Sequence, residues 1–317
     1  MITKSILIFA IISNLLGLNF LSDKFDGALY KIEGGNKNSA LAGNQNLPLP
    51  YITKKPTIEK MASRPTINAK IYLLADMDSG TVLLKSNIKD KVPIASTTKI
   101  MTAIVALENY KLDELVTVSG TATSQVGAEA FLTTGETISV RELLYCLLVQ
   151  SGNDSAYALA EHYNSTLETG TDKFVSLMNL KAKSLGMKST NYLDSAGLDV
   201  AGYSTAYDLF LATKYAMQNQ VFRQIVATKE YTAKSSDGQI FHQLVNSNRL
   251  VGEYNYPGAI GVKTGYMPEA GHCLVTAVRQ NGHILVGVVL NTYADTATAS
   301  ADESKKLFDW SSANVKW

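Results

Sequence analysis

Residues 93–107 read PIASTTKIMTAIVAL, a short polar turn that runs into a row of apolar residues. The apolar residues of 100–107 lie nearly all round a helix, so this helix is predicted to be buried inside a folded domain. Pro93 precedes it, which places Ser96 at its first turn. Residues three apart on a helix share a face, so the Lys99 amine is expected near the Ser96 hydroxyl.

A serine and a buried lysine at this spacing can perform nucleophilic chemistry. A serine hydroxyl is a poor nucleophile at neutral pH and needs an adjacent base. Lysine is a base only where burial lowers its pKa, and the apolar neighbours of Lys99 supply that setting. The helix N-terminus also offers backbone N–H groups to a developing oxyanion. The alternative for Ser96 and Lys99 is a helix cap with a surface-reaching lysine, and S-x-x-K alone is a weak signal.

Two further motifs follow along the chain. Ser151 and Asn153 stand at a predicted corner between helices, where a hydroxyl could relay a proton and an amide could hold a carbonyl. Lys263, Thr264 and Gly265 follow an apolar strand, where an ammonium and a hydroxyl could bind a carboxylate. A glycine there lets another backbone approach, and an extended peptide could add to the strand edge. Taken singly, a capped turn and a strand end are the better explanations of these motifs.

The order S-x-x-K, S-x-N, K-T-G is the mark of β-lactamases and penicillin-binding proteins. Over roughly residues 70–309 the chain resembles the low-molecular-mass penicillin-binding proteins of the D-alanyl-D-alanine carboxypeptidase type, serine peptidase family S11. Besides the three motifs, the resemblance rests on Ser151-Gly152-Asn153-Asp154, Gly197-Leu198-Asp199, Ser204-Thr205-Ala206-Tyr207-Asp208-Leu209, Gly261-Val262-Lys263-Thr264-Gly265-Tyr266 and Pro268-Glu269-Ala270-Gly271.

The resemblance implies an activity and a role for each motif residue. The expected reaction removes the terminal D-alanine from peptidoglycan stem peptides ending in acyl-D-Ala-D-Ala, with β-lactams as covalent inhibitors and without cofactor or metal. The implied catalytic residues are Ser96 as nucleophile, Lys99 as base, and Ser151 and Asn153 as proton relay and substrate holder. The implied substrate-binding residues are Lys263 and Thr264 for the carboxylate, Gly265, and Tyr266, whose N–H would share the oxyanion hole with that of Ser96.

Other functions stay open at this point. A D,D-endopeptidase acting on wall cross-links uses the same residues. A class A β-lactamase needs a glutamate after S-x-N to activate water, and Glu161 and Glu168 lie in that interval. A Ser-His-Asp triad would need one of the four histidines beside Ser96. A non-catalytic wall-binding module with the same cleft is the remaining alternative.

The strand and helix patterns predict an α+β domain. A hairpin is expected over 69–86, and late strands over 258–264, 272–278 and 283–290, the last two joined by Asn281-Gly282. Helices are expected over 100–107, 143–149, 154–163, 172–185, 205–217 and 305–310, with Ser139 and Ser204 as caps. Strands from both ends of the chain should share one antiparallel sheet. The resemblance adds a β-lactamase/transpeptidase-like fold with helices on both faces and a helical subdomain.

The first 68 residues differ from the rest in composition. Lys4 precedes an apolar run over 6–21, which is typical of a secretory signal, so 1–21 is predicted to be a signal peptide or an N-terminal membrane anchor. A flexible linker is predicted over 22–68, and the catalytic domain over 69–317. We therefore expect an exported protein, extracytoplasmic and wall- or membrane-associated, that meets the membrane only through its N-terminal segment.

Composition limits the remaining partners. The net charge of +1 gives no sign of nucleic-acid binding. Cys146 and Cys273 lie in apolar runs, so two separate buried thiols are expected, with a single disulfide as the alternative. Some relatives carry an arginine after the K-T-G strand that helps to bind the carboxylate, but residues 291–300 contain no basic residue. Carboxylate recognition is therefore expected to depend more heavily on Lys263 and Thr264.

Overall fold

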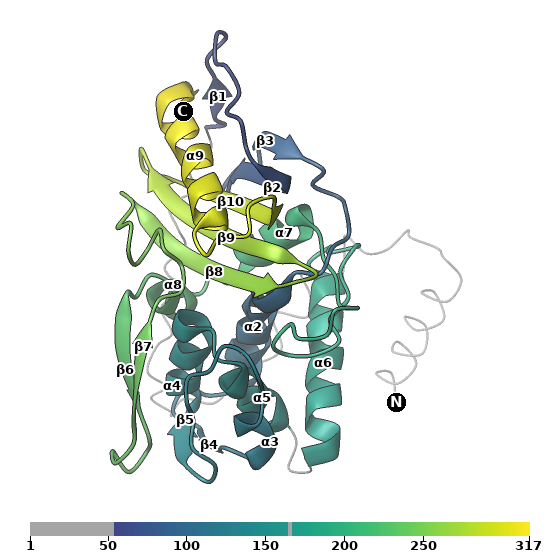
Figure 1. The fold of residues 1–317 in the computed structure, drawn as a ribbon, viewed down its shortest axis with the longest axis vertical. Coiled ribbons are helices and arrows are strands. Elements are labelled where there is room, and N and C mark those ends of the chain that lie inside the picture. Colours follow the sequence, from purple (N-terminus) through teal and green to yellow (C-terminus); the bar gives the residue numbers. More distant parts are fainter. Residues whose placement is uncertain (1–53, 164–166) are drawn as a thin grey trace, which may run out of the picture. The chain divides into compact units, whose positions relative to one another are not determined.

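An antiparallel sheet of five strands organises the molecule, and its strand order is β3–β2–β10–β9–β8 (Figure 1). The computed structural model describes residues 54–163 and 167–317. The strands of this sheet are β2 (Ala69–Asp76), β3 (Val82–Ser86), β8 (Ala259–Met267), β9 (Gly271–Gln280) and β10 (His283–Thr292). Every neighbouring pair is antiparallel. The prediction that the two ends of the chain share one antiparallel sheet is therefore confirmed.

Alternation along the strands gives the sheet a core on each face. Leu73 and Val288 pack into the core shared with most of the helices, whereas their neighbours Leu74 and Val289 pack into a second core. Successive side chains of a strand point to opposite faces, so a strand buried on both faces is apolar throughout. The central strand β10 has this character, because eight of its residues in succession are buried.

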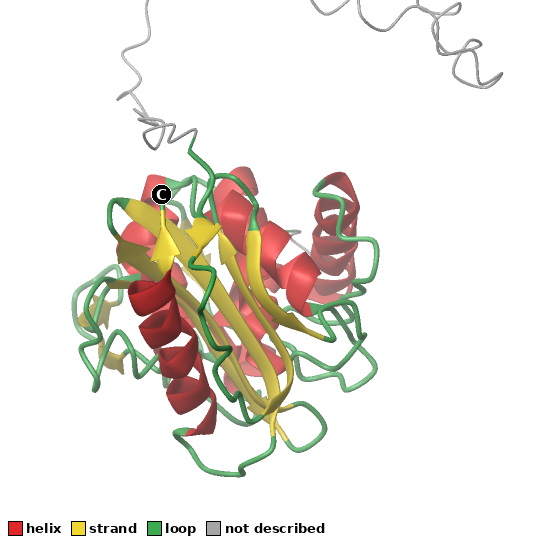
Figure 2. Cartoon of the chain, turned by 90° about the horizontal axis from the view of Figure 1, so that it is seen from above, coloured by secondary structure: helices red, strands yellow, loops and turns green. Residues whose placement is uncertain are grey.

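Helices cover both faces of the sheet, as Figure 2 shows from above. Helix α9 (Ala299–Asn314) packs on one face through Leu307 and Phe308. The remaining helices gather on the other face. They are α2 (Lys99–Asn109), α3 (Gly120–Thr123), α4 (Val140–Tyr145), α5 (Asn153–Glu161), α6 (Leu167–Ser184), α7 (Ala206–Ala216) and α8 (Gln220–Val226), with the short turns η3 (Ala95–Thr98) and η4 (Cys146–Gln150). The predicted α+β architecture is confirmed.

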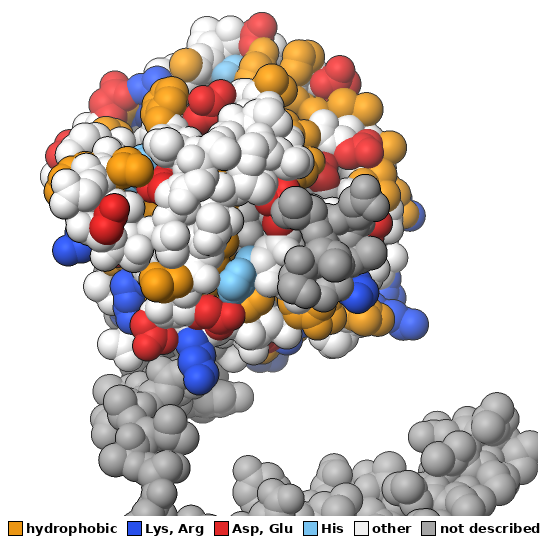
Figure 3. All heavy atoms as spheres, turned by 90° about the horizontal axis from the view of Figure 1, so that it is seen from below, with side chains coloured by type: hydrophobic (Ala, Val, Ile, Leu, Met, Phe, Trp, Pro, Cys, Tyr) orange, Lys and Arg blue, Asp and Glu red, His pale blue; other side chains and the backbone are white. Residues whose placement is uncertain are grey.

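Two small hairpins complete the helical region. Strands β4 (Leu115–Thr117) and β5 (Thr137–Ser139) form one pair, and β6 (Glu230–Lys234) and β7 (Phe241–Val245) form the other. At this end of the molecule, viewed from below in Figure 3, acidic, basic and apolar side chains are interspersed. Within the described residues, no helix is both long and apolar enough to cross a bilayer.

The folded body begins earlier than the expected boundary at residue 69. Strand β1 (Thr57–Ile58) pairs with β11 (Val315–Lys316), and the Trp310 indole donates a hydrogen bond to the Ser63 carbonyl at 2.7 Å. The last residues of the predicted linker are thus held against the C-terminal helix and strand. Their sequence has no apolar period of its own, so the pattern alone indicates a linker. The rest of that linker and the predicted signal or anchor over 1–21 lie outside the described residues.

Several predicted boundaries move. The last helix begins at Ala299, six residues before the expected 305. Its first turn buries small residues, which give no apolar pattern in the sequence. The cap of α7 is Thr205 and not Ser204, since the Thr205 hydroxyl accepts the N–H of Asp208. Ser139 does cap α4, as predicted, by accepting the N–H of Glu142. Cys146 and Cys273 are separate buried thiols.

Candidate active site

The Ser96 hydroxyl and the Lys99 amine meet where η3 passes into α2. Their Oγ and Nζ atoms are 2.8 Å apart, so the proximity predicted from the S-x-x-K spacing is confirmed. Lys99 is fully buried, whereas Ser96 keeps a partly open side. Ala95, just before the serine, has a φ of 46°, a left-handed conformation that costs a residue with a Cβ about 1–2 kcal/mol. The chain therefore turns sharply at Ala95, and Ser96 follows directly after this turn.

The hydrogen-bond partners of Lys99 determine where the lone pair of its neutral amine points. Besides Ser96, its Nζ donates to Asn153 Oδ1 at 2.6 Å and to the Ala196 carbonyl at 3.0 Å. These two oxygens can only accept hydrogen bonds, whereas the Ser96 hydroxyl can also donate one. In a neutral amine, the two remaining protons therefore go to Asn153 and Ala196. The lone pair then faces the Ser96 proton.

Burial favours this neutral form. Desolvation lowers the pKa of Lys99 to about 7, against the opposing effect of the Asp194 and Asp154 carboxylates, which raise it. A large fraction of the amine is therefore neutral near pH 7. The two carboxylates are themselves held by backbone N–H groups, since Asp154 accepts those of Ala130 and Leu132.

The S-x-N motif lies where the predicted corner between helices was expected. Ser151 follows η4 with a φ of 70°, and Asn153 opens α5. Asn153 is held from both ends, because its Nδ2 donates to the Val126 carbonyl at 2.6 Å while its Oδ1 accepts from Lys99. Ser151 lines the same cleft as Ser96, but no hydrogen bond joins its hydroxyl to Ser96 or Lys99 among the described residues.

The K-T-G motif lies on β8, the edge strand of the sheet. Lys263 is almost fully buried and donates to the carbonyl of Thr264 at 3.1 Å. Burial, and then the charge of Lys99, lower the pKa of Lys263 well below its ordinary value. Thr264 lines the cleft, and its hydroxyl is 2.7 Å from that of Ser247.

Gly265 brings β8 against the turn that carries Ser96. A Cβ at this position would lie 3.0 Å from the Ile94 oxygen and 3.0 Å from the Ser96 nitrogen. The backbone that approaches this glycine is therefore the protein's own, which refines the expectation from the motif. Tyr266, half exposed, lines the cleft beside Gly265 and packs against His272 with the ring centres 4.3 Å apart and the planes tilted by 30°.

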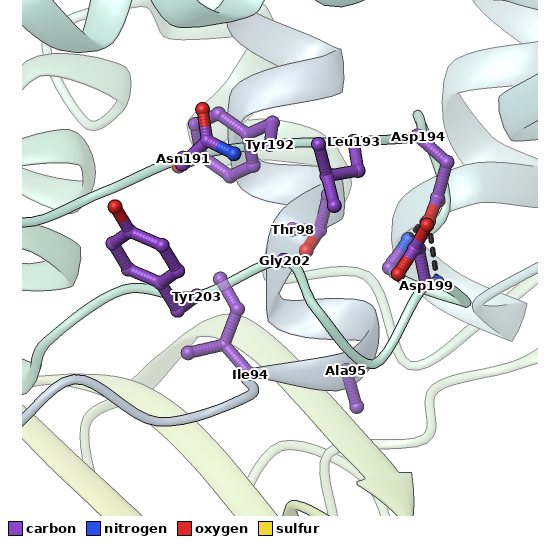
Figure 4. A pocket seen from close by; sticks show the side chains of 11 residues that line it. Ile94, Ala95, Thr98, Asn191, Tyr192, Leu193, Asp194, Asp199, Gly202 and Tyr203 are labelled. Atoms are coloured by element: carbon purple, nitrogen blue, oxygen red, sulfur yellow. Dashed lines mark hydrogen bonds between the residues drawn. The ribbon is translucent and has the colours of Figure 1, made fainter.

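A loop that contains Gly197-Leu198-Asp199, which entered the sequence analysis only through the family resemblance, holds the Lys99 acceptor in place. The Asp194 carboxylate accepts four backbone N–H groups, those of Ala196, Gly197, Leu198 and Asp199. Figure 4 shows this loop passing over the start of α2, with Asp194 turned back toward Asp199. Apart from that resemblance, its signal in the sequence is an aspartate followed by small residues. Such a pattern is common in loops that have no role in a site.

The three motifs border one open cleft of about 970 Å³. Ser96, Ser151, Asn153, Thr264, Gly265 and Tyr266 line it, and Lys99 and Lys263 lie behind its wall. Sequence reasoning missed Ser247 and Arg249, which enter the cleft from the segment between β7 and β8. The Arg249 Nε donates to the Ala297 carbonyl at 3.2 Å, and its Nη1 pairs with Glu253. A guanidinium from another loop thus reaches the segment 291–300, which has no basic residue of its own.

The histidines do not form a serine triad. All four are described, and none forms a hydrogen bond with Ser96, although His272 lines the same cleft. The nearest acidic side chains are Glu114 for His162, Glu136 for His242, Asp295 for His272 and Asp76 for His283. Of the glutamates considered for a β-lactamase, Glu161 accepts from Ser119 at 2.6 Å and is not among the residues that line the cleft. The side chain of Glu168 lies outside the described residues.

Comparison with known proteins identifies the family. Residues 58–294 match the family model Peptidase_S11, described as D-alanyl-D-alanine carboxypeptidase. The chain belongs to this family. Its resemblance to the family, first drawn from the motifs, is thereby confirmed over most of the domain.

Relatives and solved structures agree with this assignment. The chain is 38% identical to a D-alanyl-D-alanine carboxypeptidase of Streptomyces sp. K15 over 72% of this chain and 82% of that protein. It is 33% identical to a D-alanyl-D-alanine endopeptidase of Escherichia coli over 81% of both proteins. The crystal structure of the Streptomyces K15 DD-transpeptidase matches with a TM-score of 0.74 and 36% identity, over 79% of this chain and 99% of that one.

Several relatives are substantially longer than the matched region. The carboxypeptidase DacF of Bacillus subtilis is 34% identical over 79% of this chain, and the match spans 64% of DacF. Together, these comparisons show that the chain belongs to the S11 serine-peptidase family and has a transpeptidase-like fold.

Proposed function

We propose that this chain is a serine-type D-Ala-D-Ala carboxypeptidase that removes the terminal D-alanine from peptidoglycan stem peptides through an acyl-enzyme on Ser96. The observation that carries the proposal is the environment of Lys99. A fully buried amine, held by two acceptors so that its lone pair faces a serine hydroxyl, is a general base at neutral pH. A binding module has no need of that arrangement.

In the acylation step, the Ser96 Oγ attacks the carbonyl carbon of the penultimate D-alanine while its proton passes to the Lys99 Nζ. The negative charge that develops on the carbonyl oxygen is received by backbone N–H groups, for which we propose those of Ser96 and Tyr266. Collapse of the tetrahedral intermediate breaks the C–N bond. The leaving amine of D-alanine takes a proton from Lys99, and the Ser151 hydroxyl at the cleft wall is the proposed relay.

Deacylation reverses the roles. Water attacks the Ser96 ester, loses a proton to the neutral Lys99, and releases the shortened peptide as Ser96 regains its proton. Asn153 accepts one proton of Lys99 through its Oδ1. It also lines the cleft, where it is the proposed residue that holds the peptide. A β-lactam acylates the same hydroxyl and remains as a long-lived ester because its ring-opened leaving group stays attached.

Recognition of the free carboxylate is proposed for hydrogen-bond donors at the cleft near β8 and the segment before it. Lys263 and Thr264 are the proposed binding pair, with the Ser247 hydroxyl beside Thr264 as an added donor. Arg249 faces the same cleft and supplies the permanent positive charge that segment 291–300 lacks. This cluster favours a substrate that ends in a free carboxylate at the position of the terminal D-alanine.

The test combines covalent labelling with product release. Wild-type protein incubated with penicillin should gain one adduct, mapped by mass spectrometry to the peptide that contains Ser96, and should release D-alanine from an acyl-D-Ala-D-Ala peptide. Ser96→Ala should lose both. Ser236→Ala is the matched control, because this serine is exposed and lies away from the cleft. Labelling that persists in Ser96→Ala overturns the proposal.

A D,D-endopeptidase is the second candidate, because endopeptidases of Escherichia coli and Pseudomonas aeruginosa are 33% and 35% identical to this chain. A muropeptide dimer with an intact pentapeptide stem separates the two activities. Free D-alanine with an intact dimer supports the carboxypeptidase, and cleaved dimers support the endopeptidase. Rapid, repeated hydrolysis of penicillin would instead favour a β-lactamase.

The site of action is also proposed. Peptidoglycan lies outside the cytoplasmic membrane, and Lys4 with the apolar run 6–21 is typical of an export signal. We therefore propose that the chain is exported and acts at the wall, secreted or held by its N-terminal segment. Cell fractionation of a tagged chain, compared with one in which 1–21 is deleted, tests this. Equal distribution of the two chains would contradict it.

A further inference from the structure

Three side chains with metal-binding atoms meet at the end of the sheet, outside the catalytic cleft. Asp76 ends β2, Asp78 lies in the turn that follows, and His283 begins β10. One carboxylate oxygen of each aspartate and one ring nitrogen of the histidine all lie within 4.8 Å of one another. None of the three lines the cleft around Ser96. The proposed peptidase chemistry therefore gives this cluster no role.

The histidine supplies the observation that points to a ligand. His283 is 6% exposed, and its Nδ1 has no hydrogen-bond partner. The nearest acidic atom is the Oδ2 of Asp76 at 4.0 Å, which is beyond hydrogen-bond distance. A buried ring nitrogen without a partner costs about 1–3 kcal/mol, so such atoms are rare and call for an explanation. A metal ion between His283 and the aspartates would satisfy it.

The surrounding contacts hold the three groups facing inward. The Trp317 indole stacks on the His283 ring, with the ring centres 4.3 Å apart and the planes at 14°, which fixes the direction of Nδ1. The Oδ1 of Asp76 accepts the N–H and the hydroxyl of Ser79, so this carboxylate cannot rotate freely and its Oδ2 stays toward the histidine. Trp317 Nε1 also donates to that Oδ2, at 3.3 Å. A donor to a ligating carboxylate is a usual outer partner of a metal site.

Charge balance at the cluster leaves room for a cation. Lys214 lies nearby, but its ammonium donates to the backbone carbonyl of Asp78 and not to a carboxylate. Arg279 also acts on Asp78 electrostatically, yet among the described residues it forms no ion pair with either aspartate. The two carboxylates therefore share one partly buried space without a direct ion pair to lysine or arginine.

We propose that Asp76, Asp78 and His283 bind one divalent transition-metal ion, of which Zn²⁺ is the representative. Two carboxylate oxygens and an imidazole nitrogen suit zinc, and water can complete a four-coordinate site. Bonds of about 2.1 Å draw tetrahedral ligands to about 3.4 Å from one another, so ligand atoms that now lie up to 4.8 Å apart approach each other by up to about 1.4 Å on binding. The sequence gives no such prediction, because His283 lies far along the chain from the two aspartates.

The bound ion has a structural role in this proposal. It joins the β2–β3 turn to the start of β10, and Trp317 links the cluster to the segment after β11. An ion that binds only the folded chain stabilises it against unfolding. Zinc should therefore raise the melting temperature of the protein and leave the proposed peptidase activity nearly unchanged.

Zinc binding to the full chain, stripped of metal with a chelator, is the direct test. Native mass spectrometry and calorimetric titration with Zn²⁺ should show one ion per chain. Asp78→Asn should weaken binding about tenfold or more, because it removes one ligand charge. This variant should fold normally, since Lys214 contacts only the backbone of residue 78. The matched control is His162→Gln, which removes another histidine paired with a carboxylate and should bind Zn²⁺ as the wild type does.

The position of the ion is checked by nuclear magnetic resonance of the histidine side chains. Zinc should shift the ring signals of His283 and leave those of His162 unchanged. Three outcomes overturn the proposal: failure to bind Zn²⁺ at micromolar concentrations, equal affinity in Asp78→Asn, or zinc-induced shifts confined to other histidines. Because none of these measurements depends on catalysis, they stand apart from the test of Ser96.

Discussion

The pH dependence of acylation tests the role of Lys99 most directly. Only the neutral amine can take the Ser96 proton, and burial lowers the pKa of Lys99 to about 7. With that pKa, about 90% of the amine is neutral at pH 8 and about 1% at pH 5. The second-order rate constant for acylation by penicillin should therefore fall about 90-fold between these two pH values, with a midpoint near 7.

Stopped-flow acylation with a chromogenic cephalosporin measures this constant across the range, and circular dichroism at each pH confirms that the protein stays folded. A variant shows whether the midpoint belongs to Lys99. Asn153→Asp places a negative charge on the atom that is now 2.6 Å from Nζ. An opposite charge at this distance raises the pKa of an amine by about 1–3 units, so the midpoint should move to about 8–10.

Two results would refute the reasoning. A rate that is independent of pH between 5 and 8 would mean that the amine does not take the proton. A midpoint that stays near 7 in Asn153→Asp would mean that another group titrates. Asn153→Ser is the neutral comparison, because it shortens the side chain without adding a charge, and its midpoint should not rise.

Three further predictions concern glycines at close contacts and a buried ion pair. Gly265→Ala puts a methyl group 3.0 Å from backbone atoms of η3, so acylation should fall about ten- to a hundredfold in the same assay while the melting temperature changes little. Gly197→Ala should destabilise the fold by about 3 kcal/mol or more in urea denaturation, because its Cβ would lie 2.0 Å from the Ala95 oxygen and its φ is +82°. The hydrogen bond that the His242 ring donates to the Glu136 carboxylate raises the pKa of His242, so this pair contributes stability below the unfolded pKa near 6.5 and loses it as pH rises through the folded value. Glu136→Gln should therefore destabilise more at pH 6 than at pH 9, and an equal loss at both would contradict the assignment.

The sequence predicted well those features that depend on local spacing. Ser96 and Lys99 are one helical turn apart, and their contact follows from helix geometry alone. Thr264 reaches the cleft because β8 is an edge strand, a position that the sequence analysis treated only as one possibility for this strand. The central sheet followed from apolar runs at both ends of the chain.

Features that depend on distant contacts could not be predicted in the same way. The Ala196 carbonyl that orients Lys99 lies 97 positions away, and nothing in its neighbourhood marks it as an acceptor. Arg249 reaches the cleft from a loop with no motif of its own. The pairing of β1 with β11 joins residues 259 positions apart, in segments too short to show a strand pattern. Each of these contacts depends on how the whole chain packs.

The proposed catalytic centre contains residues whose burial or backbone conformation lowers the stability of the fold. The many contacts around it offset this cost. Two lysines are buried, and the energy needed to keep Lys99 neutral lowers stability at every pH below its unfolded pKa near 10.5. Ala95 and Ser151 adopt left-handed conformations on either side of the cleft. These costs are tolerable because α2 is buried along most of its length and β10 is packed on both faces. The two apolar cores hold the strained turns in place, and that rigidity keeps the Lys99 lone pair aimed at Ser96 before any substrate arrives.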